Sequence, residues 1–98
     1  MTSLSQFEKY LSLNAITVVY FSSKSCKPCG PIGELFHQYQ LRFNNLLVVD
    51  VSESFDVAIK YKITNVPMVA AFAEYKILDS YIGTDKNKFS TFVNKYAS

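Results

Sequence analysis

The sequence lacks several features that would place it in whole classes of protein. Its 98 residues include 10 basic and 8 acidic side chains, and a net charge of +2 without any Lys/Arg-rich run is too weak to suggest nucleic-acid binding. The longest apolar runs, 15–21 and 66–73, are far shorter than the roughly 20 residues that a membrane span needs. Residues 1–14 contain no apolar segment of the signal-peptide type. These absences predict a soluble, cytoplasmic protein that binds neither nucleic acid nor membrane.

Cysteine and histidine are also scarce, with two cysteines and one histidine in the chain. Two cysteines are too few for a disulfide-rich scaffold, and Cys26 and Cys29 would enclose too short a loop to add much stability. A structural zinc site normally takes four ligands, so the pair is too small for one even with His37 as a third ligand. A chemical role therefore explains the pair better than a structural one. We expect His37 itself to be a solvated surface residue.

Apolar and aromatic residues are abundant, at 49% and 15% of the chain, which predicts a single domain over residues 1–98. β-Branched apolar runs at 16–21 and 46–51 predict a parallel pair of strands that is buried on both faces. Between these runs lie apolar residues at the spacing of one helix face, namely Ile32, Leu35, Phe36, Tyr39 and Phe43. Strand, helix and strand in this order predict a βαβ unit.

The rest of the chain predicts further helices and a hairpin. Ser5 and Glu8 have the spacing of a capping box at the start of an N-terminal helix. The remaining expected elements are a short helix over 55–62, antiparallel strands at 68–73 and 77–82, and a final helix capped by Thr84 or Asp85. Together these elements predict an α/β fold, in which a central mixed four-stranded sheet is flanked by helices on both faces.

The cysteine pair directly follows the first predicted strand and opens the helix after it, in the sequence Cys26-Lys27-Pro28-Cys29. Free N–H groups and the positive end of the helix dipole stabilise a thiolate at such a position and lower the cysteine pKa. Lys24 and Lys27 flank Cys26, and the sequence has no acidic residue between positions 9 and 33. Pro28 suits the entry into a first helical turn. The pattern predicts a reactive cysteine pair.

The order strand, Cys-x-Pro-Cys, helix, strand and a later Val66-Pro67 before a hairpin resembles the thioredoxin family over residues 16–96. The resemblance implies a thioredoxin fold, with Cys26 attacking a substrate disulfide and Cys29 resolving the mixed disulfide. It implies a cis peptide bond before Pro67 and four residues that line a substrate groove, namely Ser25, Val66, Pro67 and Gly83. The implied partners are disulfide-containing proteins and a thioredoxin-reductase-like electron donor. No metal or organic cofactor is implied, and a monomer is expected.

Four positions depart from the usual pattern of the family. Ser25 stands where a tryptophan usually precedes the first cysteine, and Lys27 stands where glycine is usual. Lys27 and Pro28 are expected to tune the pKa of Cys26, and Lys27 should make the disulfide more oxidising. Tyr20 and Val48 replace a buried acid and the lysine that pairs with it, so that no charge is left buried alone. A tyrosine is a poor base near neutral pH.

The sequence therefore supports one main interpretation and leaves others open. The main interpretation is an enzyme that reduces protein disulfides through a Cys26/Cys29 dithiol–disulfide cycle, in electron transport and cell redox homeostasis. The same chemistry with a more oxidising pair would make a disulfide oxidase or isomerase. A thioredoxin-fold binding module would use the groove at Val66 and Pro67 for one partner. Zinc or Fe–S binding by the cysteines of two chains is a further interpretation.

Overall fold

The computed structural model describes residues 3–98, in which helices and strands alternate before a final hairpin and helix. Along the chain the elements are α1 (Leu4–Leu11), β1 (Thr17–Ser22), α2 (Cys29–Gln40), β2 (Leu46–Asp50), α3 (Phe55–Lys60), β3 (Met68–Ala73), β4 (Lys76–Ile82) and α4 (Lys86–Tyr96). Within residues 3–98 no helix is both long enough and apolar enough to cross a membrane.

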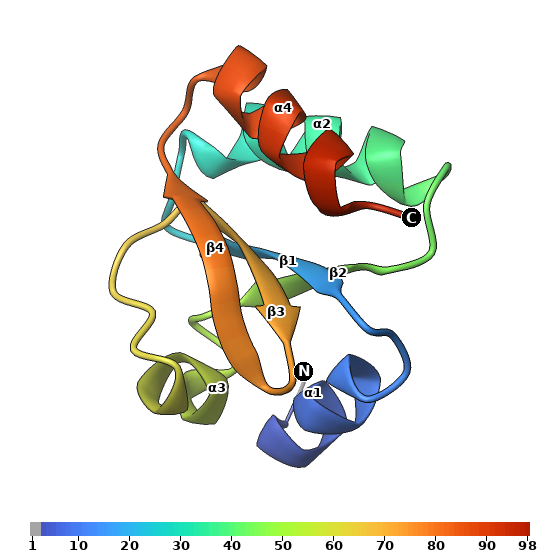
Figure 1. The fold of residues 1–98 in the computed structure, drawn as a ribbon. Coiled ribbons are helices and arrows are strands. Elements are labelled where there is room, and N and C mark those ends of the chain that lie inside the picture. The colour runs from blue at the N-terminus through green and yellow to red at the C-terminus, as the bar shows by residue number, and fades with distance from the viewer. Residues whose placement is uncertain (1–2) are drawn as a thin grey trace.

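The strands form one mixed sheet in the order β2-β1-β3-β4 (Figure 1). β1 pairs in parallel with β2 and antiparallel with β3, and β3 pairs antiparallel with β4. The predicted βαβ unit and hairpin are thus both present. The two central strands, β1 and β3, are buried along nearly their whole length, which explains their continuous apolar sequences.

β2 differs from its expected position. It lies at an edge of the sheet, and Val48 in its middle is 41% exposed. The prediction of burial on both faces is therefore wrong for this strand. An edge strand has a neighbouring strand on one side only, so its side chains are covered less well than those of a central strand. The apolar sequence of β2 does not distinguish an edge strand from a central one.

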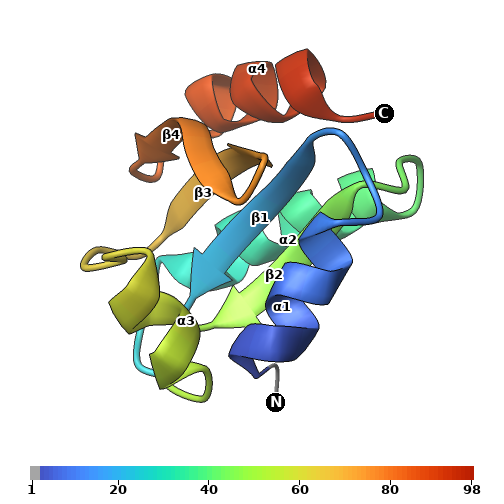
Figure 2. The same ribbon diagram turned by 60° about the horizontal axis from the view of Figure 1, so that its bottom comes forward.

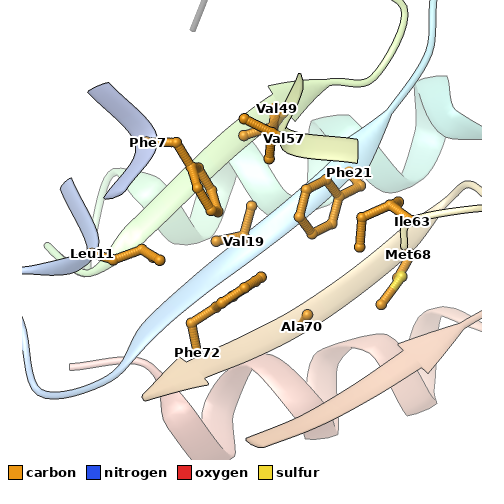
Figure 3. Packing of buried hydrophobic residues seen from close by; sticks show 10 residues of the cluster. All are labelled: Phe7, Leu11, Val19, Phe21, Val49, Val57, Ile63, Met68, Ala70 and Phe72. Atoms are coloured by element: carbon orange, nitrogen blue, oxygen red, sulfur yellow. The ribbon is translucent and has the colours of Figure 1, made fainter. Parts of the chain in front are cut away.

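Helices cover both faces of the sheet, as predicted (Figure 2). Successive side chains of a strand point to opposite faces, so Val19 and Phe21 of β1 enter one core while Val18 and Tyr20 enter the other. The first core lies under α1 and α3, and Figure 3 shows ten of its residues, Phe7, Leu11, Val19, Phe21, Val49, Val57, Ile63, Met68, Ala70 and Phe72. The second core, under α2 and α4, includes Ile32, Phe36, Phe89, Phe92 and Val93.

The capping box of α1 lies two residues before the predicted one. The hydroxyl of Ser3 accepts a hydrogen bond from the N–H of Gln6, and the Gln6 side chain accepts one from the N–H of Ser3. Glu8, expected in the box, instead accepts hydrogen bonds from Lys60 and Tyr61 of the α3 region. The sequence offers two serines at capping distance from a Gln or Glu, and the contacts of Glu8 with residues far along the chain favour the first.

The C-terminus is held by a buried asparagine in the loop after α2. The Nδ2 of Asn45 donates to the carbonyl oxygens of Ile16 and Tyr96, each at 3.0 Å. Its Oδ1 accepts from the N–H of Ser98 at 2.8 Å, and the N–H of Asn44 donates to the Ser98 carbonyl at 2.9 Å. The last residue therefore lies beside the C-terminal end of α2 (Figure 1).

Candidate redox site

A disulfide joins Cys26 and Cys29 at the N-terminus of α2. The N–H of Cys26 donates to the carbonyl of Ser23 at 3.1 Å, and the N–H of Cys29 donates to the carbonyl of Cys26 at 3.3 Å, so two tight turns lead from β1 into the helix. The helix begins at Cys29 with Pro28 as its N-cap, so the motif opens α2 with its last residue, as predicted. Cys26 is half-buried at the surface, whereas Cys29 is only 5% exposed. Of the two sulfurs, that of Cys26 is therefore better placed to meet a large substrate.

The residues expected to line a substrate groove lie at the same end of the sheet as the cysteine turn. Phe21 at the end of β1 pairs with Met68 at the start of β3, and Met68 pairs with Ile82 at the end of β4. The residues just outside this end are therefore the cysteine turn, Val66-Pro67 and Gly83. The Val66–Pro67 peptide bond is cis, and the N–H of Gly83 donates to the Pro67 carbonyl at 3.3 Å.

Gly83 has a backbone that suits no other residue well. Its φ of +151° lies in the region that glycine tolerates and residues with a Cβ avoid. A Cβ added there would stand 2.6 Å from the hydroxyl oxygen of Tyr81, which itself accepts a hydrogen bond from the N–H of Asp85. The glycine thus lets the chain turn sharply beside Pro67.

One of the two lysines that flank Cys26 in the sequence is paired with a carboxylate in the fold. Lys24 pairs with Glu53 at 2.9 Å, and Glu53 comes from the turn between β2 and α3. The absence of nearby acids in the sequence therefore misses a carboxylate that the fold brings in. Lys27 is exposed and is in neither of the two ion pairs found among the described residues. Lys27 is thus the unpaired cation beside the disulfide. Ser25 is exposed next to Cys26, within hydrogen-bond distance of Ser23.

Tyr20 contacts the first residue of α2, Cys29. Its hydroxyl donates to the carbonyl oxygen of Cys29 at 2.8 Å, and its ring packs between Phe36 and Phe89 with centroid distances of 5.4 and 5.9 Å. Burial raises the pKa of Tyr20 to about 12, so the hydroxyl stays protonated at neutral pH. Tyr20 therefore supports the first turn of α2 and does not act as a base. Val48 is its direct neighbour across the β1–β2 pair, as the sequence resemblance implied.

A cleft of about 400 Å³ opens beside the disulfide. Both cysteines, Tyr20 and Val48 line it, and it extends along α2 to His37. His37 is exposed, as expected, but its place in this cleft was not anticipated. The signal was present in the sequence, because Gly33 and His37 follow Cys29 at successive four-residue spacings, and residues four apart are neighbours on a helix surface. Within residues 3–98 no group of three or more His, Cys, Asp or Glu side chains could hold a metal ion.

A mixed sheet covered by helices on both faces, with a redox-active cysteine pair at a helix N-terminus beside a cis-proline, defines a thiol–disulfide oxidoreductase. Comparison with known proteins agrees. The family model named Thioredoxin matches residues 1–95, and the chain belongs to the thioredoxin family.

Relatives match over nearly the whole chain. Thioredoxin 1 of Plasmodium falciparum is 25% identical over 100 residues, covering 100% of this chain and 96% of that protein. Rabbit (Oryctolagus cuniculus) thioredoxin is 29% identical over 97 residues, covering 95% and 92% of the two chains. A solved structure of Plasmodium falciparum thioredoxin superposes with a TM-score of 0.89 at 25% identity, covering 99% of this chain and 97% of that one. The predicted thioredoxin fold is therefore confirmed.

Proposed function

We propose that the protein reduces disulfides of other proteins through its own Cys26/Cys29 pair. The Cys26 thiolate attacks a substrate disulfide, forms a mixed disulfide and releases one substrate thiolate, which takes a proton from solvent. Cys29 then loses its proton and attacks Sγ of Cys26, which releases the second substrate thiol and leaves the Cys26–Cys29 disulfide. The observation that carries the proposal is the unequal burial of the two cysteines, which suits one for attack and the other for resolution.

The cycle also needs a surface that holds the substrate and a donor that reduces the disulfide again. Ser25, Val66, Pro67 and Gly83 would form the groove that holds an extended substrate segment beside Cys26. A reductase of the thioredoxin-reductase type would return two electrons and two protons to the disulfide. The role would be electron transport and redox homeostasis in the cytoplasm, where thiols are kept reduced. Cell fractionation with an antibody against the protein tests the location.

The reduction potential of the Cys26–Cys29 pair is the experiment that tests the direction of the reaction. The protein is equilibrated in glutathione and dithiothreitol buffers of defined potential, and its free thiols are trapped and counted. We expect a value between about −270 and −230 mV, which would make the pair a reductant toward most protein disulfides. A value near −180 to −120 mV would instead identify an isomerase or oxidase.

Lys27 is expected to raise that potential. It is the unpaired cation beside Cys26, and a cation stabilises the thiolate and hence the reduced form. Lys27→Gly should raise the Cys26 pKa and make the potential more negative by roughly 5–20 mV, the equivalent of the 0.2–1 kcal/mol typical of an exposed charge. Thiolate absorbance against pH and the redox titration measure the two effects. Lys76→Ala, at the opposite end of the sheet, is the control; equal values for Lys27→Gly and wild type would contradict the assignment.

A further inference from the structure

The resolving cysteine needs a proton acceptor, and neither residue at the family's usual positions for one can provide it. Cys29 is only 5% exposed, so its thiol proton leaves through the cleft that its side chain lines. Tyr20, which stands behind it, keeps its own proton at neutral pH because burial raises its pKa to about 12. Val48, beside Tyr20, has no ionisable group. The requirement itself rests on the proposed reductase cycle.

The cleft beside the disulfide connects Cys29 with the other side chains that line it. Its titratable lining residues are Tyr20, Cys26, Cys29 and His37, and no carboxylate or lysine of the described residues lines it. Histidine is the side chain whose charge ordinarily changes between pH 5 and 8. The nearest carboxylate along α2 is that of Glu34, which is exposed and outside the cleft. Among the described residues that line the cleft, His37 is therefore the one outside the cysteine pair whose side chain offers a nitrogen to accept a proton.

Glycine keeps the path between the two residues open. Cys29, Gly33 and His37 follow one another at four-residue spacing and share one face of α2. A Cβ at Gly33 would lie 3.5 Å from the Tyr20 ring, so any larger side chain would extend into the cleft. Eight residues of helix span about 12 Å, so the path must be bridged by water, for which a cleft of about 400 Å³ has room.

We propose that His37 accepts the proton of the Cys29 thiol through water in this cleft during resolution of the mixed disulfide. The neutral imidazole takes the proton as Cys29 attacks Sγ of Cys26, and it returns the proton to solvent or to the departing substrate thiolate. No net proton or electron is gained or lost by His37 over a cycle. Loss of this imidazole therefore slows resolution but leaves the first attack by Cys26 unchanged.

Stopped-flow reaction of the reduced protein with dithiobis(nitrobenzoate) separates the two steps. Attack by Cys26 releases a first coloured thiolate, and resolution by Cys29 releases a second. At pH 7 we expect His37→Gln to slow the second phase by roughly a hundredfold, the low end of general-base contributions, and to leave the first phase unchanged. Imidazole added to His37→Ala should restore part of the lost rate.

Two further variants separate proton transfer from a structural effect. Gly33→Val should slow the second phase without altering His37, because its methyl groups occupy the cleft. Gln38→Ala, exposed on α2 and outside the cleft, should change neither phase. A second phase in His37→Gln within twofold of wild type at every pH overturns the role of His37 while leaving the reductase proposal intact. A wild-type protein that never releases the second thiolate overturns the reductase proposal itself.

Discussion

Replacing Cys26 by serine should abolish disulfide reduction, with a loss of at least about a thousandfold in the rate. The hydroxyl of serine stays protonated at neutral pH and does not attack a disulfide, whereas a thiolate at a helix N-terminus does. The disulfide closes a very short loop, so its loss should cost little stability and the variant should remain folded. The measurement is the rate of reduction of a protein disulfide with dithiothreitol as electron donor, together with an unfolding curve.

The companion variant Cys29→Ser shows which cysteine attacks. Cys26 would still form a mixed disulfide with the substrate, but the missing second thiol would leave that complex unresolved. A covalent complex should therefore accumulate with Cys29→Ser and be absent with Cys26→Ser, as seen on a non-reducing gel. Gln38→Ala serves as the control with normal turnover. If Cys26→Ser kept its partners and its cellular role, the protein would be a binding module that uses the groove and not the thiols.

Tyr20→Asp should destabilise the protein by about 3–5 kcal/mol, enough to leave a domain of this size marginally folded. Tyr20 is 1% exposed, and a carboxylate in its place would be buried with no cation opposite, because Val48 is the neighbour across the sheet. Burial raises the pKa of such a carboxyl group above its value in the unfolded chain. The penalty should therefore be greatest above that raised pKa and should shrink as the pH falls through it. Urea unfolding at several pH values measures this.

Introducing a lysine at position 48 should recover part of the stability that Tyr20→Asp loses. The double variant Tyr20→Asp/Val48→Lys places a cation beside the new carboxylate, and we expect it to be at least about 1 kcal/mol more stable than the sum of the single changes predicts. Tyr20→Phe is the matched control. It keeps the ring packed against Phe36 and Phe89 and loses only the hydrogen bond to Cys29, at a cost of about 1 kcal/mol. Additive energies in the double variant would show that the two positions are not coupled.

The periodicity of the sequence predicts most of this fold because nearly every element has a one-sided or two-sided apolar pattern. β1 is predicted correctly as a buried strand and β3 as a strand of the hairpin, and Asp85, one of two expected caps, does cap α4 through the N–H groups of Asn87 and Lys88. The position of β2 at the sheet edge is not predictable from its composition, since leucine and valine fill edge and central strands alike. The start of α1 depends on contacts of Glu8 with residues more than fifty positions away.

Some features of the candidate site depend on one segment of the sequence, and others depend on contacts between distant segments. Cys26 and Cys29 and the replacement at Tyr20 are visible in the sequence because they depend on spacing along one segment. The pairing of Lys24 with Glu53 is invisible there, since it is created by the return of the chain after β2. The cleft is not visible in the sequence either, because it depends on how α2 packs on the sheet, with Gly33 beside the Tyr20 ring.

The hydrogen bond between Asn45 and Ser98 has a practical consequence for identifying partners. Ser98 is fixed beside the C-terminal end of α2, whereas Cys29 is the first residue of that helix, about 18 Å away along its axis. An affinity tag or resin linker joined to Ser98 would leave the molecule near the C-terminal end of α2 (Figure 1), whereas Cys29 lies at the N-terminal end of that helix. Cys29→Ser immobilised in this way would present Cys26 to a cell extract unobstructed. Proteins eluted from it by dithiothreitol would be those it had captured covalently.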